Sequence, residues 1–157
     1  MGRASLMLAV PLVLAACGSG SKAAQTTSTT VRPTQKQFVA AANAVCERSD
    51  RRVFRLGRLS LAPAGWARTA AAAQVGVAEM AKLTAPNNER ARFARLLTDG
   101  RRLVSGIERV HAALVKRNDL LAETLQLAAT KTAAAIHRQA AVLGLTFCQQ
   151  QLTRWPA

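Results

Sequence analysis

The stretch ERARFARLLTDGRRLVSGIERVHAALVKR, residues 89–117, has the most regular apolar spacing in the chain and decides the fold. Apolar and small residues recur in it at steps of about three and four, namely Phe93, Leu96, Leu97, Gly100, Leu103, Val104, Ile107, Val110 and Leu114. This spacing, sustained over about three heptads, predicts a long core helix in a bundle. Arg95, Arg102, Arg109 and Lys116 recur every seven residues on another stripe, which is typical of a solvated helix face.

Apolar spacing predicts three further helices around this one. A first helix over about 34–60 begins at a capping box formed by Thr34 and Gln37, and Pro63 and Gly65 are expected to stop it. The other two are expected over about 66–83 and 119–152. The expected inner positions of the helix over 34–60 are Phe38, Ala42, Val45, Cys46, Ser49, Val53 and Leu56. Those of the helix over 66–83 are Trp66, Ala70, Ala73, Val77 and Met80. Those of the helix over 119–152 are Leu121, Leu125, Ala129, Thr132, Ile136, Ala140, Leu143 and Phe147.

Four helices over about 34–60, 66–83, 88–117 and 119–152, joined by short connections, favour antiparallel neighbours. We therefore expect an all-α fold, an up-down-up-down four-helix bundle that forms one domain over 34–157. No stretch needs to be a strand. The second helix is short, so a three-helix core with a side hairpin is the alternative.

The first residues read as a secretory signal, with Arg3 followed by an apolar run that is too short to span a bilayer. The run ends in Leu14-Ala15-Ala16-Cys17, which resembles the lipobox of bacterial lipoproteins. This resemblance implies removal of residues 1–16, a diacylglycerol on the Cys17 sulfur and, in some members, an acylated (for example palmitoylated) amine. Two or more acyl chains anchor a protein stably to a membrane. The alternative is an ordinary signal peptide that leaves Cys17 as a free thiol.

Residues 17–33 contain many Ser and Thr and almost no large apolar side chain, which predicts a disordered tether after the lipidated cysteine. A flexible chain of about 16 residues spans roughly 20–24 Å. We therefore expect the bundle to lie at the extracytoplasmic face of the cell membrane. The Ser and Thr hydroxyl groups of the tether could carry sugar, although linker composition alone explains them.

Assigning Cys17 to lipid leaves an even pair of cysteines, Cys46 and Cys148, in a compartment where disulfides persist. We expect these two to form a disulfide, because the inner side of the first helix and the end of the last one meet in an antiparallel bundle. Two separate buried thiols are the alternative.

The chain is strongly basic, with 22 Lys and Arg against 8 Asp and Glu. Its densest cluster is on the first helix, where Arg48, Arg51, Arg52, Arg55 and Arg58 form a candidate face for an anionic partner. An exported, lipid-anchored domain meets anionic lipid headgroups or anionic wall polymers, so we expect no nucleic acid partner. The alternative is a merely solvated face, rich in arginine because the genome is rich in GC.

Catalytic and metal-binding motifs are weak. Glu108 and His111 have the Glu-x-x-His spacing of di-iron bundles, but His137 has Ala134 where the second glutamate should stand, so we expect no metal. No Cys-x-x-Cys-His motif for covalent haem occurs. A non-covalent haem held by Met80 and His111 is the alternative to our expectation of no cofactor. The chain also lacks a nucleophile motif, so we expect no enzyme.

The layout resembles a group of small actinobacterial helical lipoproteins, with a lipobox, a Thr-rich tether, FVAAANAVC at 38–46 and LGLTFC at 143–148. The resemblance implies the disulfide and the helical fold and carries no active site. We expect a lipid-anchored envelope protein that acts by binding, as a scaffold or a partner of an unidentified protein. A small-ligand carrier or sensor, with a cavity between alanine-rich helices, is the alternative.

Overall fold

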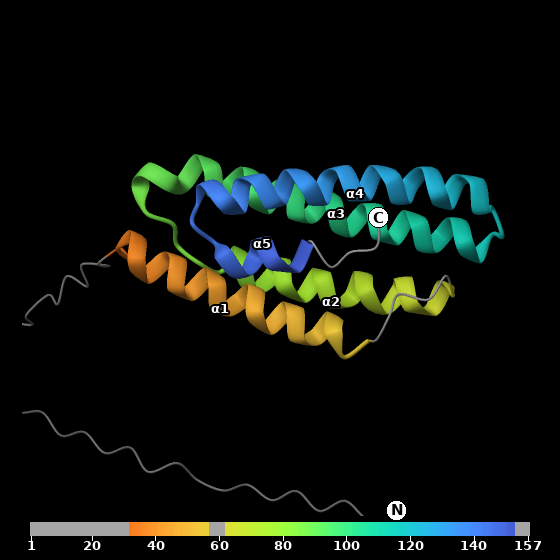
Figure 1. The fold of residues 1–157 in the computed structure, drawn as a ribbon, viewed down its shortest axis with the longest axis horizontal. Coiled ribbons are helices and arrows are strands. Elements are labelled where there is room, and N and C mark those ends of the chain that lie inside the picture. Colours follow the sequence, from red (N-terminus) through yellow and green to blue (C-terminus); the bar gives the residue numbers. More distant parts are fainter. Residues whose placement is uncertain (1–31, 57–61, 153–157) are drawn as a thin grey trace, which may run out of the picture. The chain divides into compact units, whose positions relative to one another are not determined.

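The computed structural model describes residues 32–56 and 62–152, with side chains up to 149. These residues form helices and turns, with no strand among them. The helices are α1 (Gln35–Phe54), α2 (Pro63–Ala81), the short 3-10 helix η1 (Asn87–Glu89), α3 (Arg90–Val115), α4 (Asp119–Val142) and α5 (Thr146–Leu152). The four long helices alternate in direction (Figure 1), so the expected all-α antiparallel arrangement is confirmed. The expected signal peptide and nearly all of the expected tether lie outside the described residues.

The helices form two layers. In Figure 1, α3 and α4 lie side by side in one layer, and α1 and α2 lie in the other. The short α5 contacts both α1 and α4, which have no Cα pair within 8 Å of each other. The fifth helix therefore fills the place where the first and last long helices would otherwise meet.

The expected single helix over 119–152 is wrong, because it breaks at Gly144. This glycine has a φ of 74°, in the left-handed region that favours glycine. The amide of Leu145 donates to the carbonyl of Ala140 at 2.9 Å, and that of Gly144 donates to Ala141 at 3.0 Å, which is the Schellman pattern of a helix end. The break turns the chain, so Leu145 is fully buried and Phe147, expected in the core, is 44 % exposed.

Two other boundaries differ from expectation. The first helix ends at Phe54 and not near residue 60, and residues 57–61 lie outside the described part. Pro63, expected to stop the first helix, instead begins α2, three residues before the expected start at Trp66. Proline suits the first position of a helix because its missing N–H would have no partner there.

The core consists of two clusters of buried side chains. One lies where α1 begins and contains Phe38, Val45, Phe93 and Leu143 among others. The rings of Phe38 and Phe93 meet edge to face, with centroids 5.0 Å apart. The other cluster, around Ile107, joins α2, α3 and α4 without α1. The structure is thus a four-helix bundle at one end and a three-helix core at the other.

The expected disulfide joins Cys46 of α1 to Cys148 of α5, with Cα atoms 5.2 Å apart. The Asn43 side chain of α1 also accepts a hydrogen bond from the amide of Phe147, at 3.2 Å. The disulfide closes a loop with a sequence separation of 102 residues. In the chain-entropy model such a loop stabilises the fold by about 4.7 kcal/mol.

Glycines allow close approach of α1 to α2 and of α3 to α4, but to different degrees. A Cβ atom built on Gly76 of α2 would lie 2.6 Å from the Oγ and 3.2 Å from the Cβ of Ser49 in α1. A Cβ atom on Gly106 of α3 would lie 3.5 Å from the Cβ of Ala129, an ordinary contact. Only at the first position would a methyl group force its neighbour, Ser49, to shift.

The variants Gly76→Ala and Gly106→Ala test this packing. Both gain helix propensity of up to about 1 kcal/mol, but Gly76→Ala also overpacks the α1–α2 contact, which costs about 1–3 kcal/mol. We expect Gly76→Ala to lower the free energy of unfolding and Gly106→Ala to leave it unchanged or raise it, as measured by urea denaturation. Equal or greater stability of Gly76→Ala would contradict the close approach.

Candidate functional site

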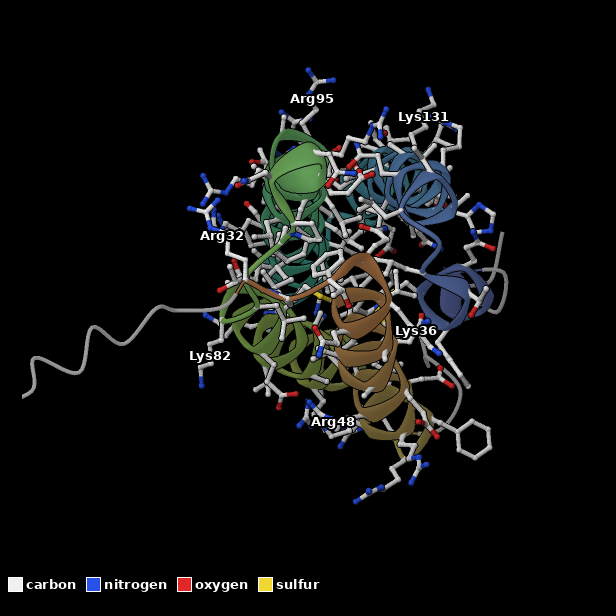
Figure 2. The ribbon with its side chains drawn as sticks, turned by 90° about the vertical axis from the view of Figure 1, so that its left-hand side faces the viewer. Arg32, Lys36, Arg48, Lys82, Arg95 and Lys131 are labelled. Carbon is white, nitrogen blue, oxygen red and sulfur yellow. A yellow bond between two sulfur atoms is a disulfide. The ribbon has the colours of Figure 1, made fainter. Side chains whose placement is uncertain are left out.

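The predicted arginine face of α1 is partly used to join two helices. Arg48 Nε donates a hydrogen bond to Glu79 Oε2 at 3.3 Å, and Arg52 Nη2 pairs with Glu79 Oε1. Glu79 belongs to α2, so one carboxylate binds two arginines across the α1–α2 contact. Figure 2 shows Arg48 on the side of the bundle formed by these two helices. Both arginines thus have a structural role in the packing of α1 on α2.

The remaining arginines of this face differ from one another. Arg51 pairs with Glu47 one turn earlier in the same helix. Arg55 is exposed and forms no ion pair with any other described residue. Arg58 lies outside the described residues. Three of the four arginines described here therefore have acidic partners, two of them sharing one carboxylate, and the face carries less free charge than its sequence indicates.

The arginine pair changes the acidity of Glu79. The hydrogen bond from Arg52 is the largest influence and holds the pKa of Glu79 below its ordinary value of 4.5. The hydrogen bond from Arg48 acts in the same direction, while partial burial opposes both. A lowered pKa means that the folded protein binds the Glu79 proton less tightly than the unfolded chain does, so the ionised carboxylate stabilises the fold.

This linkage predicts a pH-dependent effect of Glu79→Gln. At about pH 7 the variant should have a lower free energy of unfolding than the wild type, because it lacks the carboxylate. The stabilisation is present above 4.5 and is lost as the pH falls through the lowered pKa of Glu79, so the difference should shrink towards about pH 3. Urea denaturation at both pH values measures it.

Glu123→Gln is the matched control, because Glu123 is exposed on α4 and forms no ion pair with a described residue. It should change stability little at either pH. If Glu79→Gln lowers the free energy of unfolding by the same amount at low pH as at pH 7, the ion-pair interpretation is contradicted.

The stripe on α3 carries most of its charge uncompensated. Arg95, Arg109 and Lys116 are exposed, and their side chains form neither an ion pair nor a hydrogen bond with the described residues. Arg102 pairs with Asp99 at 3.2 Å. All eight Asp and Glu side chains of the protein lie in the described ranges, so no acidic side chain elsewhere can neutralise this stripe.

The stripe is therefore the stronger candidate for an anionic partner, although its sequence pattern indicated only a solvated face. The seven-residue repeat identified the stripe, but the sequence could not show which cations have acidic partners. That depends on side chains of other helices, such as Glu79 of α2 beside Arg48.

The residues considered for metal or haem are not brought together. Within 32–56 and 62–152, no group of three His, Cys, Asp or Glu side chains is placed to hold a metal ion. Met80 packs in the core cluster where α1 begins. His111 is in the last turns of α3, at the opposite end of the bundle in Figure 1. Met80 and His111 therefore cannot hold one haem together.

A depression of about 300 Å³ lies at the end of α1 and is lined by Asp50, Arg51, Phe54 and Arg55. Phe54 is 77 % exposed, so the depression is open to solvent. It does not lie between the alanine-rich helices, where the small-ligand alternative places its cavity. This depression therefore lends that alternative no support.

None of the described helices combines the length and the apolar character needed to cross a membrane. Comparison of the chain with models of protein families, with curated proteins and with solved structures gives no match.

Proposed function

We propose that this protein is an exported, lipid-anchored binding or scaffold protein that docks on an anionic surface of the cell envelope through a basic helix face. In this proposal Cys17 carries the lipid and the bundle stands at the extracytoplasmic face of the membrane. The protein performs no chemistry there and acts by binding. The face is the α3 stripe, defined by Arg95, Arg102, Arg109 and Lys116, which replaces the α1 arginines as the leading candidate.

The uncompensated charge of the α3 stripe carries this proposal. Three of the four cations lie on a helix of 26 residues, which is about 39 Å long, and the fourth, Lys116, directly follows its last residue. Spacing of about 10 Å between successive charges is comparable to the Debye length at 0.1 M salt. A single anionic surface can lie along the stripe, and each of its three unpaired cations, Arg95, Arg109 and Lys116, adds about 1 kcal/mol when it is held near that surface.

Two other features support the location. The Cys46–Cys148 disulfide suits a compartment outside the cytoplasm, where such bonds persist. The lipobox-like stretch before Cys17 supports a lipid anchor in the same compartment.

The anchor is tested by metabolic labelling with a radioactive fatty acid. The wild-type protein should incorporate the label, and Cys17→Ser should not, because the acylated sulfur is missing. The Cys46→Ser/Cys148→Ser variant is the control and should keep the label. Label on Cys17→Ser would show that Cys17 is not the lipidated residue.

The α3 stripe is tested by binding of a long-chain polyphosphate to residues 17–157 carrying Cys17→Ser. The triple variant Arg95→Gln/Arg109→Gln/Lys116→Gln should bind more weakly at about 0.1 M salt, by a factor on the order of 100. Binding by the parent protein should weaken strongly at about 1 M salt, where the Debye length falls to about 3 Å.

The matched control is Lys36→Gln/Arg68→Gln/Lys82→Gln. It removes the same number of charges from exposed positions on or next to α1 and α2 that form no ion pair with other described residues. Equal loss of binding in both triple variants would show that only the net charge matters and would contradict a docking face on α3.

A further inference from the structure

We infer that the surface on which this protein docks is an anionic phospholipid bilayer, and that the bundle lies on it with the outer side of its α3–α4 layer. This inference rests on the proposed function and narrows its partner from any polyanion to a lipid surface. Cations of α3 and α4 would meet the headgroups, and exposed apolar side chains of α4 would enter the interfacial region.

The outward side of α4 carries an apolar and basic stripe. Leu120, Leu127, Lys131, Arg138 and Val142 follow one another at steps of seven, four, seven and four residues, which places them on one side of the helix. Leu120 is 77 % exposed, Leu127 59 % and Val142 64 %. The core of the same helix is formed by the opposite side, where Leu125 and Ala129 are buried. We call these five residues the α4 stripe.

The α4 stripe and the α3 stripe belong to the same side of the protein. Figure 2 views the bundle along its helices and shows Arg95 of α3 and Lys131 of α4 pointing away from α1 and α2. Lys36, Arg48 and Lys82 lie on the other side of the same view. The two stripes thus form one surface, which we call the α3–α4 outer face.

This face is positively charged overall. The two stripes that define it carry the basic side chains Arg95, Arg102, Arg109, Lys116, Lys131 and Arg138 and no acidic side chain. Of these, Arg102 pairs with Asp99. A second copy of the chain would bring like charges together, so self-association through this face is unfavourable.

The exposed apolar side chains distinguish a bilayer from a soluble polyanion. A phosphate-rich polymer can bind the cations but leaves Leu120 and Leu127 in water. A bilayer offers anionic headgroups and, a few ångströms below them, an apolar interior. Basic residues mixed with exposed leucine and valine on one helix side are the composition of helices that lie in a membrane interface.

The position of the N-terminal segment allows this orientation. Arg32 donates a hydrogen bond to Asn87, so the described chain begins beside the start of α3. The tether length expected from the sequence is roughly 20–24 Å, and a helix with its side chains is about 10–12 Å across. The expected tether is therefore longer than one helix is wide.

The test compares vesicles with polyphosphate, using residues 17–157 with Cys17→Ser so that no acyl chain contributes. The vesicles contain phosphatidylglycerol and phosphatidylcholine. Leu120→Gln/Leu127→Gln should weaken sedimentation with these vesicles about 10-fold or more, since two apolar side chains no longer leave water. It should leave polyphosphate binding unchanged.

Val75→Gln is the matched control, because Val75 is 45 % exposed on α2, in the other layer. It should not change vesicle binding. Circular dichroism of each variant checks that the bundle is folded, and the substituted leucines are exposed, so loss of the fold is not expected.

Insertion is tested separately with Leu127→Trp and, as its control, Val75→Trp. Vesicles should shift the tryptophan emission of Leu127→Trp to shorter wavelength, and brominated lipid should quench it. The emission of Val75→Trp should not change. The protein's own Trp66 and Trp155 also emit, so the change is taken relative to the parent protein with the same vesicles. This difference reports the position of α4 itself and does not depend on the strength of binding.

The outcomes separate the inference from the proposed function. Suppose that the parent protein binds polyphosphate and that Leu120→Gln/Leu127→Gln binds vesicles as well as the parent does. This result would overturn the inference of a bilayer and would keep the proposal of a basic docking face. If the parent protein binds neither vesicles nor polyphosphate, both the proposed docking face and the bilayer inference are overturned. Formation of a dimer that depends on Leu120 and Leu127, measured by analytical ultracentrifugation, would assign the face to a second copy and also overturn the inference.

Discussion

The contact between α1 and α5 completes the bundle, because no Cα atom of α1 comes within 8 Å of one in α4. Leu143 and Leu145 at the α4–α5 turn fill the core beside Phe38, and the Cys46–Cys148 disulfide joins α5 to α1. The helix α5 has only seven residues, and helices this short are unstable alone in water. The disulfide and the hydrogen bond from Phe147 to Asn43 compensate for this shortness, so a small element can hold two long helices in one core.

The basic residues of the protein have two different environments, one at the contact between helices and one facing solvent. Arg48 and Arg52 meet Glu79 where α1 packs on α2, and this pairing lowers the pKa of the carboxyl group. The α3 stripe faces solvent with few acidic neighbours. Cations that stabilise packing are poorly placed to bind a partner, since their carboxylate competes with it. The unpaired cations of α3, and the exposed apolar side chains of α4 beside them, therefore carry the functional proposals.

Long regular helices were predictable because apolar residues that recur many times at three- and four-residue steps identify both the helix and its core positions. Phe93, Leu96, Leu103 and Ile107 were expected in the core and are buried. The break at Gly144 was not predicted, since Ala140, Leu143 and Phe147 continue the spacing of a single helix across it. A glycine near the end of an apolar repeat was the available signal. Leu121 was also expected inside but is 45 % exposed, because Ala122 occupies the core position.

The amino-acid sequence by itself determined the all-helical class, the alternation of the long helices and the pairing of Cys46 with Cys148. These follow from local periodicity, short connections and the prediction that Cys17 carries lipid, which leaves two cysteines to pair. Only the tertiary structure decided that α5 lies between α1 and α4, that Glu79 binds two arginines, and that the stripes of α3 and α4 share one face. Each of these depends on side chains far apart in the chain that meet only after the helices pack, and helical periodicity carries no information about which neighbour a given side will meet.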